Sequence, residues 1–68
     1  MADDVKYPDV VVDLENVDGN AMSIIAKVAR GLSRAGVPAA EITEFKREAT
    51  SGDFDNVIQT AMRWVEVE

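Results

Sequence analysis

Apolar and polar residues alternate near the start of the chain, as expected for a β-strand with one buried face. Between residues 9 and 17, Val10, Val12 and Leu14 fall on one side of an extended backbone, and acids occupy positions between them. Two further valines interrupt the alternation, so the second face is only partly polar. The pattern predicts a strand over 9–17, preceded by a flexible polar lead-in over 1–8.

The next apolar pattern is helical. Asp18-Gly19-Asn20 is typical of a turn that leads into a helix, because Asp and Asn side chains accept hydrogen bonds from free backbone N–H groups. From Ala21 onward, apolar residues recur three, four and seven positions apart, at Ile24, Ile25, Val28, Leu32 and Ala35. Gly36 stands where a left-handed residue closes a helix, and Val37 stands where that closing motif adds an apolar contact. The pattern predicts a helix from about 21 to 35.

Two more helices and a closing strand are predicted in the second half of the chain. Pro38 favours a new helix over about 38–49, and Ile42, Phe45 and Ala49 form its buried stripe. Asp53 can cap a third helix over 54–64, whose apolar side contains Val57, Ile58, Ala61, Met62 and Trp64. Residues 64–68 alternate with period two, which predicts a short strand beside the first one; a fraying helix end is the alternative.

We therefore expect one small α+β domain over residues 9–68. Its element order is β-α-α-α-β, with a short two-stranded sheet packed on three helices. A single strand beside a helical bundle is the alternative. The length of 68 residues suits one domain, and 47% hydrophobic residues are typical of a folded globule.

The composition excludes the commonest catalytic groups. The chain contains neither histidine nor cysteine, so a Ser-His-Asp triad and a thiolate metal site are impossible. The acids around Asp13 do not match a calcium-binding loop, which requires glycine at position six and glutamate at position twelve. We therefore predict no enzyme activity, no catalytic residues, no cofactor and no bound metal.

The net charge of −6 argues against general nucleic-acid binding, which requires a positive surface. No apolar run approaches the length of a membrane span, and the first residues contain no apolar signal segment. We therefore expect a cytoplasmic protein with no membrane association and no nucleic-acid partner.

A basic stripe on the first predicted helix is the main candidate site. Lys27, Arg30 and Arg34 are three, four and seven positions apart, so they share one helix face. No acid occurs between Asn20 and Glu41, which concentrates positive charge in an otherwise acidic chain. This stripe predicts a docking face for an acidic protein, a nucleotide or a nucleic-acid backbone. A protein partner is the preferred interpretation, with self-association as a further option. The alternative is a solvated face whose bases favour the helix C-terminus.

Two polar turns are the candidate sites for a small anionic ligand or nucleotide. Free N–H groups at a helix start attract anions, and hydroxyl groups add donors. The residues concerned are Asp18, Gly19, Asn20, Thr50, Ser51 and Gly52. The acids at these turns oppose an anion, and each turn is also explained as a helix end followed by a helix cap.

Five short segments resemble a group of short, uncharacterised proteins of bacterial and phage genomes. The segments are Tyr7-Pro-Asp-Val10, Asp18-Gly-Asn-Ala21, Arg34-Ala-Gly-Val37, Glu48-Ala-Thr-Ser-Gly-Asp53 and Met62-Arg-Trp-Val65. The resemblance covers almost the whole chain and implies no activity and no functional residue. A phage setting suggests a small protein that binds and modulates a host macromolecule.

Overall fold

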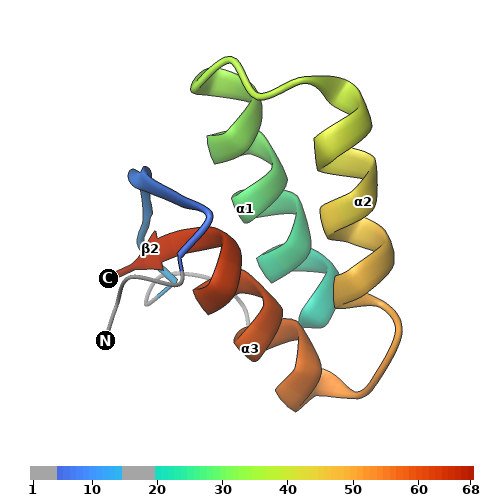
Figure 1. Ribbon diagram of the computed structural model, residues 1–68. Helices are drawn as coiled ribbons and strands as arrows, with labels where there is room; N and C mark the ends of the chain where they lie inside the picture. The colour runs from blue at the N-terminus through green and yellow to red at the C-terminus, as the bar shows by residue number, and fades with distance from the viewer. Residues whose placement is uncertain (1–4, 15–19) are drawn as a thin grey trace.

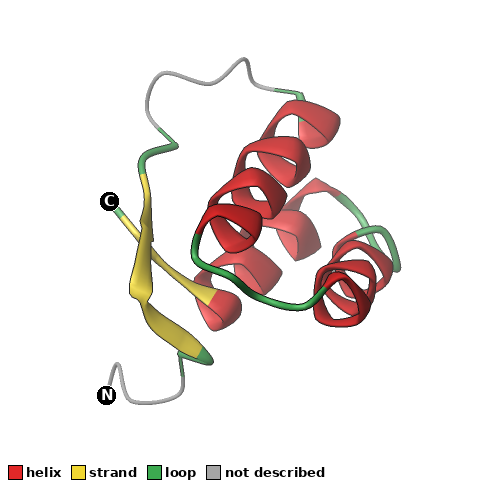
Figure 2. Ribbon diagram, turned by 90° about the horizontal axis from the view of Figure 1, so that it is seen from above, coloured by secondary structure: helices red, strands yellow, loops and turns green. Residues whose placement is uncertain are grey.

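Two parallel strands form one layer of the protein, and three helices form the other (Figures 1 and 2). The computed structural model describes residues 5–14 and 20–68. The elements along the chain are β1 (Tyr7–Val12), α1 (Ala21–Arg34), α2 (Ala39–Ala49), α3 (Phe54–Trp64) and β2 (Val65–Val67). The predicted α+β class and the β-α-α-α-β order are therefore confirmed, and the chain ends in a strand rather than a fraying helix.

The sheet is short and irregular. Tyr7 pairs with Val65 and Val12 pairs with Val67, with a register shift between them. β2 follows α3 directly, so the last helical residue, Trp64, adjoins the first strand residue. The backbone N–H of Glu68 donates to the carbonyl of Val12 at 2.9 Å, which extends the pairing past β2. The sheet thus joins the two ends of the described chain.

The predicted bounds of the first strand were wrong at both ends. β1 begins at Tyr7, so Tyr7 and Pro8 belong to the fold instead of the lead-in expected over 1–8. It ends at Val12, although the alternation continues further along the sequence. The physical reason is the partner strand: β2 spans Val65–Val67, and its last residue already pairs with Val12. Residues 15–17 of the predicted strand lie outside the described residues.

The predicted helix ends are correct to within a residue because local hydrogen bonds specify them. Asn20 caps α1 by accepting from the N–H of Met22, at 2.8 Å. At the other end, Gly36 adopts φ +87°, and the N–H of Val37 donates to the carbonyl of Leu32 at 3.0 Å. These are the features of a Schellman motif, which releases the chain toward α2.

The core lies where the three helices meet the sheet. Its fully buried large side chains include Phe45, Leu32, Val28 and Val65, and Trp64 is only 2% exposed. The predicted core roles of Phe45 and Trp64 are therefore confirmed. Met62, which was expected on the apolar side of α3, is 54% exposed, and Thr60 is buried in its place. Thr60 lies three residues after Val57 and four before Trp64, so it shares their helix face, whereas Met62 does not.

Candidate functional site

The three cations of the basic stripe lie together on the side of α1 that faces away from its buried residues. Lys27 is half-buried, whereas Arg30 and Arg34 are exposed. Together with Val11, Val12 and Asp13 of the β1 side, they line a hollow of about 190 Å³. We call Lys27, Arg30 and Arg34 the α1 basic face. Its geometry agrees with the helical spacing in the sequence, and its role in partner binding stays a prediction.

The ion pairs found among the described residues lie outside the α1 basic face. Among residues 5–14 and 20–68, the ion pairs join Lys6 to Glu41 and Arg47 to Glu44, and neither includes a cation of this face. Of the residues that the structure describes, one acid, Asp13, lines the same hollow, and it already has an interaction partner. Exposed arginines in this arrangement are suited to bidentate contacts with carboxylates.

The turn between α2 and α3 uses its hydroxyl groups to close α2. The Thr50 hydroxyl donates to the carbonyl of Lys46 at 2.8 Å, and the Ser51 hydroxyl donates to the carbonyl of Glu48 at 2.7 Å. A hydroxyl has one proton to donate, so in this geometry neither group offers a donor to an anion. The described geometry therefore favours a structural role for Thr50 and Ser51.

Gly52 serves close packing rather than a left-handed turn. A Cβ atom at this position would lie 2.9 Å from the Cβ of Asn56, and the positive φ among the described glycines belongs to Gly36. The Asn56 side chain in turn donates to the carbonyl of Glu48 at 2.8 Å. Asp53 caps α3 by accepting from the N–H of Asn56, at 3.1 Å. Each polar group here completes a helix end.

The other turn proposed as a ligand site is described only in part. Asn20 is occupied as the cap of α1, accepting from the N–H of Met22. Asp18 and Gly19 lie outside the described residues. The described members of the two turns thus give the small-ligand alternative no specific support.

An apolar groove between α1 and α2 was not predicted from the sequence. It has a volume of about 440 Å³, and its lining contains Met22, Ile25 and Ala26 of α1 with Thr43, Lys46 and Arg47 of α2 and Thr50, the C-cap of α2. We call it the α1–α2 groove. The two helices lie side by side in both views (Figures 1 and 2). Met22 is 66% exposed, the largest exposed fraction among the described large apolar side chains.

The α1–α2 groove continues into the α1 basic face. A neighbouring hollow of about 350 Å³ is lined by Ser23, Ala26, Lys27 and Arg30. Ala26 lines both hollows, so they adjoin along α1. The sequence signal that could have revealed the groove is the pair Lys46 and Arg47, whose positions also suit the negative end of the α2 dipole.

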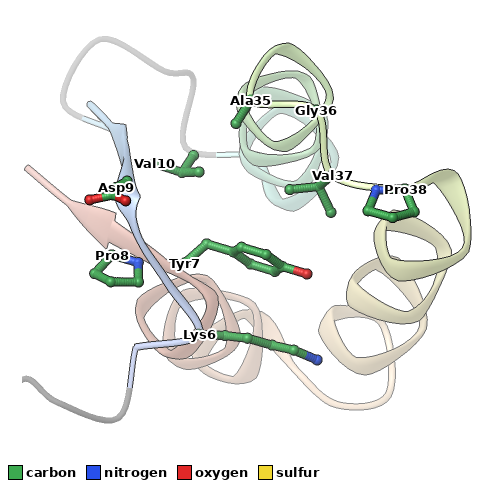
Figure 3. A pocket seen from close by; sticks show the side chains of 9 residues that line it. All are labelled: Lys6, Tyr7, Pro8, Asp9, Val10, Ala35, Gly36, Val37 and Pro38. Carbon is green, nitrogen blue, oxygen red and sulfur yellow. The ribbon is translucent and has the colours of Figure 1, made fainter.

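A separate hollow, of about 360 Å³, lies between the start of β1 and the turn from α1 to α2. Figure 3 shows the Lys6 and Tyr7 side chains extending toward α2, whereas Asp9 points away from the hollow. The Lys6 Nζ atom lies 3.0 Å from the Glu41 Oε1 atom and 4.3 Å from the centre of the Trp64 ring. The Tyr7 ring stacks on Trp64 with centroids 5.9 Å apart. These contacts fasten β1 to the helices.

The ion pair between Lys6 and Glu41 shifts the pKa values of both groups. The hydrogen bond from Lys6 lowers the pKa of the Glu41 carboxyl, and the same bond raises the pKa of Lys6. Partial burial raises the pKa of Tyr7, with a further contribution from the Glu41 charge. The charged forms of Lys6 and Glu41 and the neutral form of Tyr7 are favoured near pH 7, which is the pattern of a structural contact.

No family model matches the chain, and neither a curated protein nor a solved structure matches it significantly. Within the described parts of the chain, no helix is long and apolar enough to cross a membrane. Within the same residues, no three acidic side chains gather closely enough to hold a metal ion. The function must therefore be inferred from the chemistry of the surface.

Proposed function

We propose that this chain is a small, non-enzymatic interaction module that binds a partner protein through the α1 basic face. The observation that carries the proposal is the concentration of Lys27, Arg30 and Arg34 on one side of α1 in a chain of net charge −6. A local field opposite in sign to that of the whole molecule orients an approaching partner and selects against partners of the wrong charge.

A protein is the favoured partner class because of what surrounds these cations. The overall negative charge repels a nucleic-acid backbone beyond the immediate contact. In the part of the chain that the structure describes, no aromatic residue lines the hollow at the α1 basic face, so the described lining offers bases no stacking platform. Arginine side chains, by contrast, pair readily with the carboxylates of an acidic protein surface.

The proposal also covers where the protein works and what it binds. The resemblance to short bacterial and phage proteins suggests a cytoplasmic protein that modulates a host macromolecule by occupying one of its surfaces. A second copy of the chain is the remaining protein partner, because its acidic surfaces could meet the α1 basic face.

The test compares two charge changes of equal size at different places. Replacing Arg30→Gln together with Arg34→Gln lowers the net charge by two units, and the single reversal Arg63→Glu on α3 lowers it by the same amount. Arg63 is exposed in the last turn of its helix, as Arg34 is, so it serves as the control. Its guanidinium donates to the Thr60 hydroxyl at 3.4 Å, which is long for a hydrogen bond, so its replacement should disturb the fold little. Tagged forms of each protein are used to capture partners from a host lysate.

We expect the wild type and Arg63→Glu to retain the same partner and the double variant to lose it. Circular dichroism spectra of the three proteins should coincide, because all these positions are on helix surfaces. Equal capture by all three proteins would contradict the assignment of the α1 basic face. Equal loss of the partner in both variants would also contradict it, because the loss would then follow from net charge alone.

A further inference from the structure

We propose that the α1–α2 groove accommodates an acidic amphipathic helix of the partner protein, with an apolar side chain of that helix lying on Met22, Ile25 and Ala26. The inference rests on the proposed function and adds the chemistry of the partner. The α1 basic face supplies charge, and the adjoining α1–α2 groove supplies the apolar contact that gives such an encounter lasting affinity.

The first observation is the apolar floor. Of the described large apolar side chains, Met22 is the most exposed, at 66%, and it lies in the groove rather than alone on the surface. Ala26 is also exposed, and it extends the apolar surface of the groove toward Arg30. Methionine is flexible and polarisable, and it adapts to the shape of an incoming apolar side chain.

The second observation is the separation of charge on α2. Lys46 and Arg47 line the groove, whereas Glu41 and Glu48 are turned to other partners. Glu41 binds Lys6, and Glu48 accepts a hydrogen bond from Trp64 at 3.0 Å. Among the described residues, no acid lines the groove or the hollow next to it. Glu44 does touch Arg47, at 3.8 Å, but both side chains are largely exposed and the pair is weak.

Together, the two helices place cations on both sides of the apolar floor. Lys27 and Arg30 of α1 lie beyond Ala26, and Lys46 and Arg47 of α2 form the opposite wall. An occupant that matches this surface has one apolar stripe flanked by carboxylates on each side. An acidic amphipathic helix has this pattern, because its apolar residues recur every three to four positions and its acids fill the remaining faces.

The shape of the groove also favours a helical occupant. Thr43 and Thr50 line opposite ends of its α2 wall and are seven residues apart, which is about two helical turns or roughly 10 Å. Ser23 and Ala26 are small, so the partner's helix can approach α1 closely and insert its side chains between α1 and α2. None of the described residues that line the groove is aromatic, which disfavours nucleic-acid bases as the occupant.

The experiment uses displayed peptides as the probe. A random library of peptides about 15 residues long, which is enough for a helix to form, is selected for binding to the intact wild-type protein. The affinity of the enriched peptides is then measured by fluorescence anisotropy. The groove variant is Ala26→Glu, which puts a carboxylate on the floor. The matched control is Gln59→Glu, which adds the same charge at an exposed position of α3.

We expect enriched peptides to combine Asp or Glu with apolar residues at helical spacing. Their binding should weaken by about tenfold or more in Ala26→Glu, because the new carboxylate both fills the floor and repels the acids. Binding to Gln59→Glu should stay within about twofold of wild type, and rising salt should weaken binding to both. The variant Met22→Glu, at an exposed position in the first turn of α1, repeats the test at a site where an acid suits the helix.

Enrichment of basic or uncharged peptides, no enrichment at all, or equal weakening in Ala26→Glu and Gln59→Glu would overturn the inference. Tighter binding of a single-stranded DNA than of any acidic peptide would overturn it in favour of a nucleic acid. The proposed function is tested separately by lysate capture. If Arg30→Gln with Arg34→Gln loses the captured partner while Ala26→Glu keeps it, the α1 basic face stands and the groove does not.

Discussion

The hydrogen bond between Trp64 and Glu48 provides a sharp test of how the core is joined to the helix surface. Trp64 is 2% exposed, and its indole N–H donates to the Glu48 Oε1 atom at 3.0 Å. Replacing Glu48→Ala removes that acceptor without disturbing the ring itself. The indole N–H then remains buried without its carboxylate partner, which is the costly half of a broken hydrogen bond.

The expected loss follows from the geometry. A hydrogen bond to a charged group contributes about 1.5–3 kcal/mol, and the half-buried position of Glu48 favours the lower part of that range, so we expect a loss of about 1–2 kcal/mol. A domain of 68 residues has a total stability of about 3–10 kcal/mol, so the variant should still fold. For a chain of this size, the melting temperature should fall by roughly 5–15 °C.

Urea denaturation followed by circular dichroism measures the free energy of unfolding in a double-mutant cycle. The second substitution is Trp64→Phe, which keeps an aromatic ring and removes the indole N–H. In that background, Glu48→Ala should cost almost nothing, giving a coupling of about 1–2 kcal/mol. A coupling below about 0.3–0.5 kcal/mol, the range expected of independent sites, would refute the proposed bond energy.

Three further perturbations test other parts of the fold. Since the hydrogen bond from Lys6 lowers the pKa of Glu41, its stabilisation should be present above the ordinary value of 4.5 and lost as the pH falls through the folded-state pKa. Melting curves of wild type and Glu41→Gln should therefore differ at neutral pH and converge in acid; a constant difference would contradict the pairing. Gly36→Ala should cost about 1–2 kcal/mol in a urea titration because φ is +87°, and a neutral result would argue against the left-handed cap. Phe45→Ala should cost about 3–5 kcal/mol and Met62→Ala less than about 0.5 kcal/mol in the same assay; similar losses would contradict the observed burial.

The sequence predicted the helices well because their ends depend on near neighbours. Asn20 and Asp53 cap through bonds two or three residues away, and Gly36 closes α1 within its own turn. The bounds of β1 failed because a strand is defined by a distant partner. Nothing near Tyr7 indicates that Val65 will pair with it or that Trp64 will stack on its ring.

For the candidate site, too, the features set by near neighbours were predicted, and those set by the packing of distant elements were not. Spacing on a single helix was enough to place Lys27, Arg30 and Arg34 on one face. The α1–α2 groove could not be predicted that way, because its walls come from two helices and its charge pattern appears only once they are packed. Lys46 and Arg47 looked like ordinary partners of a helix dipole until the structure placed them beside Met22.

Site-specific photo-crosslinking in host cells tests the central claim most directly. A photoreactive amino acid is placed at Ser33, which is exposed on α1 between Arg30 and Arg34 in the sequence, or at Gln59, which is exposed on α3. If the α1 basic face binds a partner protein, light should yield a discrete adduct from Ser33 that Arg30→Gln with Arg34→Gln abolishes, and none from Gln59. Adducts formed from Gln59 alone, or equally from both positions, would contradict the proposal.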